Sequence, residues 1–415
     1  MLISVEDYRK QARHLPRFVF KYVDGAAEDE RCLDRNRAAL DAITLVPQVL
    51  RDTTTVATGI EVFGRQWAQP FGAAPTGFNG LLRPKGDLLI ARAAASAGVP
   101  FMLSTASNTR LEEVAGAGGM QWLQLYVMGA RSIAELLVRR ARANKFEALV
   151  LTVDVPVSGY RERDVRNGFR LPFKPTPKTL LDLCLHPGWV LRQGAAGTPQ
   201  FANLTESENE ITSPQLQAAL LASTMDRSLA WESLAWLRQL WDGPLLVKGL
   251  LHYEDALRAV NAGADGIIVS CHGGRQLDAA PATMTVLPRF VDMINGRIPV
   301  FVDSGFRRVS DVAKALACGA TSAFIGRPLL YGLGADGERG VSAVFKLFGQ
   351  KLLRTLILFG ARSPKELGPD NLLDAVRASQ RLQAAPADGG RSRALPLFGA
   401  AAASTPARIK IHVWR

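Results

Sequence analysis

The sequence predicts an α/β fold, a (β/α)8 TIM barrel with an N-terminal helical cap and a long insertion after its fourth strand. Eight short apolar segments recur along the 415 residues, each bounded by turn residues, and stretches with helical spacing lie between them. Polar and charged residues gather where these segments end, which is where barrel enzymes carry their active sites. A doubly wound open sheet is the alternative, but no segment is followed by a G-x-G-x-x-G turn.

The eight segments lack the polar alternation of a half-exposed sheet, which indicates strands that are buried on both faces. In chain order they cover residues 71–77, 100–105, 121–127, 148–154, 245–249, 266–270, 299–305 and 321–327. Helical spacing is clearest in residues 131–143, 228–240, 253–262 and 309–318. The interval between the fourth and fifth segments is far longer than the others, so we expect an insertion at about residues 170–225.

The two ends of the chain flank the barrel, which we expect at about residues 66–360. Residues 1–65 predict a helical cap, and residues 337–380 are expected to continue the last helix. We therefore expect one catalytic domain over residues 1–380. Residues 381–415 are rich in Ala, Pro, Gly and Arg, which is typical of a flexible basic tail.

The net charge of +12 comes from 50 Lys and Arg against 38 Asp and Glu. Residues 381–415 hold six basic residues and one acidic residue, and residues 170–200 hold four basic residues and one acidic residue. The rest of the chain therefore carries only +4. This distribution argues against a nucleic-acid groove through the fold, so we expect no nucleic-acid partner.

Four cysteines, at positions 32, 184, 271 and 318, are scattered without a CxxC pair. Their spacing indicates neither a disulfide framework nor a zinc ribbon, so we expect no metal and a reducing cytoplasm. The N-terminal residues lack the apolar run and cleavage site of a signal peptide. No apolar run reaches the roughly 18 residues that a membrane-spanning helix needs.

The densest group of functional residue types follows the sixth segment, from Ser270 to Asp278. Two glycines after His272 let the backbone approach a ligand closely, and Arg275 can present its fork to a carboxylate. A lone histidine is more often structural. The strand-end position and the Gly-Gly-Arg sequence that follows favour a functional His272.

Asp154 ends the fourth segment, and Arg161 and Arg163 follow it. A carboxylate at a buried strand end needs a partner, and His272 on a nearby strand is a natural one, whose imidazole Asp154 would orient. The alternative is that Asp154 caps a turn and that the Arg-Glu-Arg-Asp run forms a salt-bridged surface.

Three further strand ends carry charge. Lys248 ends the fifth segment inside an apolar run, where it either approaches an electron-rich group or forms a salt bridge with Asp303. The seventh and eighth segments end in Asp-Ser-Gly-Phe-Arg at 303–307 and Gly-Arg at 326–327. Loops after these two strands commonly bind a phosphate, so a phosphate-bearing cofactor or substrate is expected.

Together these motifs resemble the FMN-dependent α-hydroxy acid dehydrogenase and oxidase family. In chain order they are APTG at 74–77, LST at 103–105, QLY at 124–126, TVD at 152–154, LVKG at 246–249, HGGRQLD at 272–278 and DSGFR at 303–307. The resemblance covers residues 3–375, and the occurrence of all motifs in order is highly specific. It implies an FMN cofactor that lies across the mouth of the barrel.

The resemblance also implies which residues hold FMN. The phosphate would lie on Gly305, Arg307, Gly326 and Arg327. The ring system and ribityl chain would contact Ala74, Ser104, Gln124, Thr152 and Lys248, and the remaining expected contacts are Pro75, Thr76, Ser270 and Asp303. The positive charge of Lys248 would stabilise negative charge on the flavin.

The resemblance assigns catalytic roles to six residues. His272 is the expected general base, with Asp154 behind it. Arg161 and Arg275 would bind the substrate carboxylate, and Tyr22 and Tyr126 would hydrogen-bond the carboxylate and hydroxyl. The reaction would oxidise an (S)-2-hydroxy acid to a 2-keto acid. His272 would take either the α-proton or the hydroxyl proton, and the sequence leaves both routes open.

Three features narrow the substrate. Residues 178–203 resemble the segment of membrane-associated mandelate dehydrogenases, and their basic and apolar residues suit an interfacial anchor; the alternative is an ordinary active-site loop. Gly80 matches a glycine of these dehydrogenases near the flavin, where many oxidases have alanine. Ala106 lies where glycolate oxidases carry Trp, which leaves room for a larger side chain. Cys271 departs from the family, which usually has Asn there.

We therefore expect oxidation of (S)-mandelate to phenylglyoxylate, with electrons passed to a membrane quinone. The expected location is the cytoplasmic face of the inner membrane, or else the cytoplasm, and the expected assembly is a homotetramer. A quinone-linked L-lactate dehydrogenase or a hydroxy acid oxidase is the alternative within the family. An FMN barrel isomerase and a membrane-surface scaffold without enzymatic activity are the alternatives outside it.

Overall fold

The computed structural model describes residues 2–169, 176–197, 199–204 and 225–373. They all lie in the first of two compact units, Met1–Ala384. The second unit, Ala385–Arg415, lies outside the described residues, and so does the whole predicted tail at 381–415.

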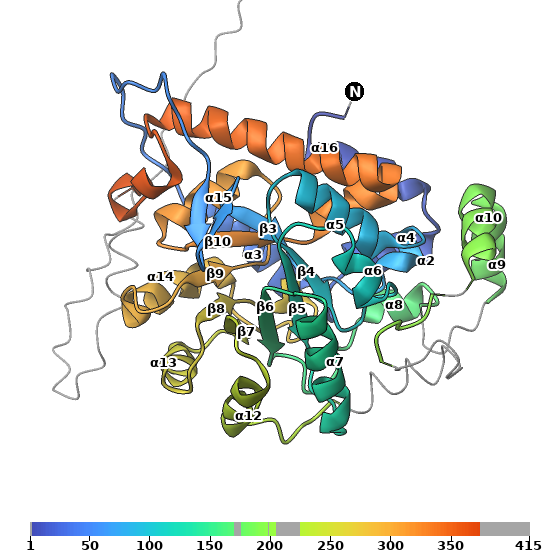
Figure 1. Ribbon diagram of the computed structural model, residues 1–415. Helices are drawn as coiled ribbons and strands as arrows, with labels where there is room; N and C mark the ends of the chain where they lie inside the picture. The colour runs from blue at the N-terminus through green and yellow to red at the C-terminus, as the bar shows by residue number, and fades with distance from the viewer. Residues whose placement is uncertain (1, 170–175, 198, 205–224, 374–415) are drawn as a thin grey trace, which may run out of the picture. The chain divides into compact units, whose positions relative to one another are not determined.

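Eight parallel strands form a closed barrel at the centre of this unit (Figure 1). They are β3 (Phe71–Ala73), β4 (Phe101–Ser104), β5 (Gln121–Leu125), β6 (Ala148–Thr152), β7 (Leu245–Leu250), β8 (Gly266–Val269), β9 (Val300–Val302) and β10 (Ser322–Ile325). The barrel closes because β10 pairs with both β9 and β3. Each strand lies within or across one of the eight apolar segments, which confirms the predicted TIM barrel.

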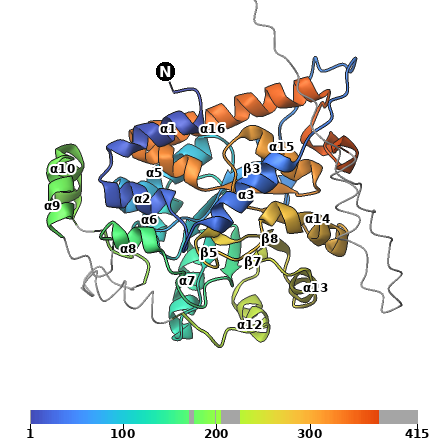
Figure 2. The same ribbon diagram turned by 180° about the vertical axis from the view of Figure 1, so that it is seen from behind.

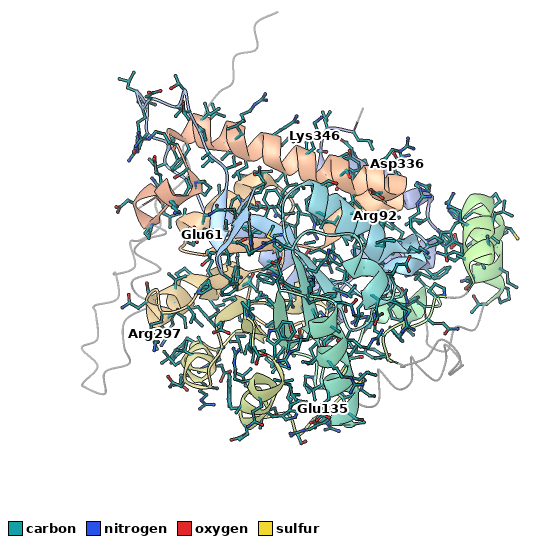
Figure 3. All side chains as sticks on the ribbon, viewed as in Figure 1. Glu61, Arg92, Glu135, Arg297, Asp336 and Lys346 are labelled. Carbon is teal, nitrogen blue, oxygen red and sulfur yellow. The ribbon has the colours of Figure 1, made fainter. Side chains whose placement is uncertain are left out.

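Helices surround the barrel as the spacing predicts. They are α5 (Gly86–Ser96), α6 (Leu111–Ala115), α7 (Arg131–Ala143), α12 (Glu232–Leu240), α13 (Tyr253–Asn261), α14 (Thr283–Ile294), α15 (Val309–Ala317) and α16 (Arg327–Phe359). Figure 3 labels exposed charged side chains on their outer faces, including Arg92 on α5, Glu135 on α7 and Lys346 on α16. The apolar faces pack inward on the strands.

The predicted extent of the last helix was wrong. α16 ends at Phe359, because Gly360 adopts a left-handed conformation with φ 76° that terminates the helix. Two single 3-10 turns follow, η3 (Pro364–Glu366) and η4 (Pro369–Asn371).

The N-terminal segment forms the predicted cap. It contains α1 (Val5–Gln11), the 3-10 turn η1 (Ala12–His14), α2 (Arg17–Asp24) and α3 (Arg31–Ala42). A capping box between Ser4 and Asp7 starts α1. α2 buries Phe18, Val19 and Phe20, which ties the cap to the main core. Figure 2 shows the cap helices α1, α2 and α3.

A hairpin that the sequence did not predict follows the cap. β1 (Ile60–Val62) and β2 (Arg65–Trp67) are antiparallel, and Phe63 and Gly64 turn between them with positive φ. Trp67 packs on three rings of the barrel interior, those of Trp122, Phe301 and Phe324, with centroids 5.5 to 6.2 Å away. This packing fills one end of the barrel, so its functional cavity lies at the other end.

Two helices of the predicted insertion, α9 (Pro177–Cys184) and α10 (Pro187–Ala196), lie at the edge of the barrel outside α2 and α8 (Glu162–Arg166) (Figures 1 and 2). The Trp189 indole N–H donates to the carbonyl of Leu81 at 2.9 Å. Leu81 follows Gly80 in the short helix α4 (Asn79–Leu82). Within the described ranges, no helix is both long enough and apolar enough to cross a membrane.

Candidate active site

A cavity opens where the barrel strands end. Its wall includes a large share of the predicted site residues, brought together from almost every strand end: Tyr22, Ala74, Pro75, Thr76, Ser104, Tyr126, Arg161, Lys248, His272, Arg275, Asp303, Gly305, Arg307, Gly326 and Arg327. Four further predicted residues, Gln124, Thr152, Asp154 and Ser270, lie on the same strand ends, directly behind this wall.

His272 and Asp154 form a hydrogen-bonded pair in this cavity wall. The Nδ1 atom of His272 lies 3.0 and 3.2 Å from the two carboxylate oxygens of Asp154. Burial alone would raise the pKa of Asp154, but the charges of His272 and Lys248 lower it below its ordinary value. Asp154 is therefore an anion that fixes the imidazole, with Nε2 directed toward the cavity and 3.4 Å from the Tyr126 hydroxyl.

The backbone around His272 is held in a rarely adopted conformation. His272, Gly273 and Gly274 in the 3-10 turn η2 (His272–Gly274) have φ values of 55°, 66° and 77°. The hydroxyl of Ser270 accepts from the His272 N–H, and that of Ser304 accepts from the Gly273 N–H. Such strain persists where the surroundings hold it, often at functional sites. This sharp turn aims the imidazole across the barrel mouth.

Arg161 and Arg275 lie together beside this histidine. The Nη1 atom of Arg275 donates to the carbonyls of Tyr22 and Gly25 at 2.6 and 3.1 Å, and its guanidinium lies 4.7 Å from the Tyr22 ring centroid. Burial, with the nearby charge of Arg275, lowers the pKa of Arg161 to about 10. Two half-buried guanidinium groups side by side form a site that a carboxylate would stabilise.

Arg163, from the same sequence run, points elsewhere. It forms ion pairs with Asp24 and Glu30, so the salt-bridge interpretation of the run holds for Arg163 but not for Arg161.

Lys248 is a buried cation in β7, two residues before the strand ends, and is 3% exposed. Its Nζ donates to the Ser270 hydroxyl at 3.0 Å and lies 3.3 Å from the Asp303 carboxylate, so the expected salt bridge is present. Burial alone would lower the pKa of Lys248, but the carboxylates of Asp303 and Asp154 raise it above its ordinary value. The lysine therefore keeps its charge at the cavity wall.

The sequence model of the FMN-dependent dehydrogenase family matches residues 11–374. The chain belongs to this family.

Curated relatives of this FMN-dependent 2-hydroxy acid dehydrogenase include a mandelate dehydrogenase and L-lactate dehydrogenases. An (S)-mandelate dehydrogenase of Pseudomonas putida is 48% identical over 373 residues, which is 89% of this chain and 94% of that protein. An L-lactate dehydrogenase of Vibrio parahaemolyticus is 39% identical over 377 residues, which is 90% of this chain and 99% of that protein. Sequence identity to both kinds of dehydrogenase shows the family but does not determine the substrate.

Solved structures of a mandelate dehydrogenase and a mandelate oxidase have the same fold as this dehydrogenase. A structure described as that of the monotopic membrane protein (S)-mandelate dehydrogenase superposes with a TM-score of 0.86 at 47% identity. The superposition covers 90% of this chain and 99% of the mandelate dehydrogenase chain. A mandelate oxidase structure superposes with a TM-score of 0.74 at 36% identity, covering 92% and 98% of the two chains.

FMN is the cofactor of this family, and unsatisfied polar atoms at the barrel mouth fit it. Within the described part of the chain, Gln124 Nε2, Thr152 Oγ1 and Arg275 Nη2 are buried without a hydrogen-bond partner. The Gln124 side-chain oxygen already accepts from the Ser104 hydroxyl at 3.1 Å. Buried polar groups normally have partners, so these atoms suit a polar ligand such as the flavin and the substrate carboxylate.

The expected phosphate residues lie together at the ends of β9 and β10. Gly326 is the N-cap of α16, and Arg307 lines the same part of the cavity. Arg327 has a second task, because its guanidinium donates to the carbonyls of Val23, Gly25 and Gly273 at 2.7 to 3.0 Å. Burial, with the nearby charge of Arg307, lowers the pKa of Arg327 to about 9. Arg327 thus ties the cap to the His272 turn beside the expected phosphate residues.

The expectation for Gly80 requires a correction. Gly80 lies in α4 and packs against Asn108, outside the residues that line the cavity. Gly77 lines the cavity instead, and a Cβ at that position would lie 2.9 Å from the Ala106 Cβ. Ala106 lines the cavity, as expected. Of the two glycines in residues 76–80, the sequence interpretation therefore chose the one that does not line the cavity.

Sequence reasoning missed the aromatic part of the wall. Phe78, Phe169 and Phe201 line the cavity together with Tyr22. Two of them come from the segment between β6 and β7, whose place over the cavity depends on tertiary contacts. Isolated phenylalanines carry no motif that could have singled them out.

Proposed function

We propose that this dehydrogenase oxidises (S)-mandelate to phenylglyoxylate and passes the electrons to a membrane quinone. The observation that carries the substrate is an aromatic-walled pocket next to the His272 and Arg275 side chains. The higher identity to the mandelate dehydrogenase than to the L-lactate dehydrogenase supports the same choice.

The pocket wall has the chemistry to bind a phenyl group. The Phe78 ring lies 4.6 Å from that of Phe201 and 6.2 Å from that of Phe169, and the Phe169 ring lies 4.6 Å from that of Tyr22. Ala106 packs with Phe201 and presents only a methyl group. Aromatic rings pack favourably edge to face at such separations. A methyl substituent, as in lactate, would leave most of this wall uncovered.

The chain's own residues bind and orient the substrate. Arg161 and Arg275 bind the carboxylate, and its negative charge offsets the cost of burying the two guanidinium groups. Tyr126 donates to the substrate oxygen beside His272. Bound FMN supplies the acceptor for the two electrons that leave the α-carbon.

His272 moves the proton. Its Nε2 faces the cavity and accepts a proton from the α-carbon or from the hydroxyl, while Nδ1–H remains hydrogen-bonded to Asp154. The Asp154 carboxylate, which stays ionised, stabilises the positive charge that His272 gains. Lys248 places a second positive charge beneath the site, where negative charge accumulates.

Peripheral membrane contact through residues 178–203 completes the proposal. Leu181, Leu185 and Leu191 are 65%, 71% and 73% exposed on the α9–α10 pair, beside Lys178 and Arg192. Exposed leucines with flanking basic residues suit an anionic membrane surface. The solved mandelate dehydrogenase is described as a monotopic membrane protein, which supports this placement. We place the dehydrogenase, as a homotetramer, on the cytoplasmic face of the inner membrane.

The substrate is tested by anaerobic flavin reduction with (S)-mandelate, L-lactate and glycolate in parallel. The fastest bleaching of the yellow colour is expected with (S)-mandelate, and faster bleaching with L-lactate would instead establish the lactate alternative. Rapid peroxide formation on readmission of oxygen would favour an oxidase over quinone transfer.

The membrane contact is tested with the triple variant Leu181→Ser, Leu185→Ser and Leu191→Ser on anionic phospholipid vesicles. Loss of sedimentation with the vesicles is expected. A matched control replaces Leu353 and Leu358, which are exposed on α16, by serine. Equal binding of both variants would refute the placement.

A further inference from the structure

Two cysteines from distant parts of the sequence meet beneath the His272 turn. Cys271 directly precedes His272, and Cys32 lies in the first turn of α3 in the cap. Their side chains are 5% and 0% exposed and share one small apolar cluster with Ala280. Both are free thiols.

Asn36, one turn further along α3, holds the two sulfur atoms together. Its Nδ2 lies 3.1 Å from the Cys271 sulfur, 3.5 Å from the Cys32 sulfur and 2.6 Å from the Cys32 carbonyl. Its side-chain oxygen accepts from the Thr283 N–H at 3.2 Å, so the amide cannot rotate freely. One fixed donor therefore bridges both thiols.

The segments that carry the two cysteines also approach each other closely. A Cβ added to Gly274 would lie 2.9 Å from the backbone nitrogen of Leu33, the residue after Cys32. The Cys32 N–H donates to the Asp278 carboxylate at 2.8 Å, which anchors the start of α3 to the segment that follows His272. Close backbone approach is what a disulfide requires.

The two thiols differ in their chemistry. A hydrogen bond from Cys32 lowers the pKa of Cys271, with burial opposing it and Ser304 and Asn36 adding to it. The pKa of Cys32 is raised by the same hydrogen bond and by burial. Cys271 is therefore the nucleophile of the pair, since thiolates rather than thiols attack oxidants. Ser304, its hydrogen-bonding neighbour, lines the active-site cavity, so a small oxidant in the cavity is one side chain away.

We propose that Cys271 and Cys32 are an oxidation site for hydrogen peroxide that closes to a disulfide and slows the dehydrogenase. The Cys271 sulfur attacks one peroxide oxygen, the O–O bond breaks, and after protonation the products are a sulfenic acid and water. The Cys32 sulfur then attacks the sulfenic sulfur, the S–S bond forms, and a second water leaves with the Cys32 proton. Two thiols are oxidised by two electrons, and one peroxide is reduced to two waters.

Disulfide closure acts on catalysis through His272. It draws the Cys271 sulfur away from Asn36 and Ser304 and shifts the backbone that starts the strained His272 turn. A displacement of about 1 Å at a catalytic group slows a reaction by about 10²-fold. We expect a loss of that size in flavin reduction, reversible by a dithiol.

The test uses the purified full-length holoenzyme, exposed to hydrogen peroxide and then alkylated after denaturation. Peptide mass mapping is expected to find a Cys32–Cys271 cross-linked peptide, and the rate of flavin reduction by substrate to fall about 10²-fold and recover with dithiothreitol. The Cys32→Ala and Cys32→Ser variants, checked for bound FMN by their visible spectra, should show neither the cross-link nor the reversible loss. Cys318→Ala should behave like the unmodified protein.

Two results would overturn the proposal. The first is that Cys271 remains reduced after peroxide treatment, or is oxidised to a sulfinic acid without forming a cross-link. The other is a cross-linked enzyme with an unchanged reduction rate. Because the cross-link is detected by mass, its absence is distinguishable from an error in the proposed substrate.

Discussion

The Asp154→Asn variant tests how the anion behind His272 contributes to catalysis. The Asp154 carboxylate lies 3.0 Å from His272 Nδ1 and keeps its charge because its pKa is lowered. The substitution preserves the shape of the side chain but removes the charge that stabilises a protonated imidazole. A hydrogen bond to a charged group contributes about 1.5–3 kcal/mol, and about 1.4 kcal/mol corresponds to a tenfold change in rate. Flavin reduction should therefore slow by about 10- to 10²-fold.

The loss should fall on the rate constant rather than on binding, because the proposed carboxylate site, Arg161 and Arg275, does not include Asp154. Anaerobic stopped-flow reduction at several (S)-mandelate concentrations separates the limiting rate from the apparent dissociation constant. Asp292→Asn, an exposed aspartate on α14, is the charge-matched control. A limiting rate within twofold of the unmodified enzyme, or a defect confined to the dissociation constant, would refute the reasoning.

Three further predictions concern the pocket, the buried cation and the cap. Ala106→Trp should fill the space beside Phe201 and lower kcat/KM for (S)-mandelate at least about tenfold more than for L-lactate, since overpacking costs about 1–3 kcal/mol; equal losses would contradict the pocket assignment. Lys248→Met leaves the buried Asp303 carboxylate with the Ser304 hydroxyl as a donor but without an opposite charge, so the free energy of unfolding in urea should fall by about 3–5 kcal/mol; a change below about 1 kcal/mol would contradict it. Burial alone would raise the pKa of Asp24, but Arg9 lowers it to about 2. Asp24→Asn should therefore lower the free energy of unfolding by about 2 kcal/mol at pH 7. Because the folded pKa is the lower one, that difference should persist down to about pH 4 and close toward pH 2; a difference independent of pH would contradict it.

The barrel was predictable because its strands are buried on both faces. Segments such as 148–154 and 266–270 are continuous apolar runs, and the helix at Arg131–Ala143 has the bounds that its spacing predicts. The β1–β2 hairpin escaped notice because each strand has only three residues and β2 exposes two of them. The end of α16 was missed although Gly360 and the prolines that follow it, Pro364 and Pro369, are helix stop signals in the sequence.

The site was predictable where a motif carries it and unpredictable where tertiary contacts make it. His272, Asp154 and Lys248 each lie within three residues of a strand's carboxyl end, and parallel strands bring these ends to one rim. The meeting of Cys32 with Cys271 has no local signature, because α3 must first fold over the barrel mouth. Gly77 and Gly80 lie three residues apart, and only the backbone path shows which one faces the cavity.

The central claim is that His272 drives oxidation of a 2-hydroxy acid at a bound flavin. Anaerobic addition of (S)-mandelate to the purified unmodified enzyme and to the His272→Ala variant tests it most directly. The unmodified enzyme should lose its yellow flavin absorbance, and His272→Ala should retain bound FMN while its reduction is almost abolished. Bleaching of His272→Ala at the rate of the unmodified enzyme would contradict the account.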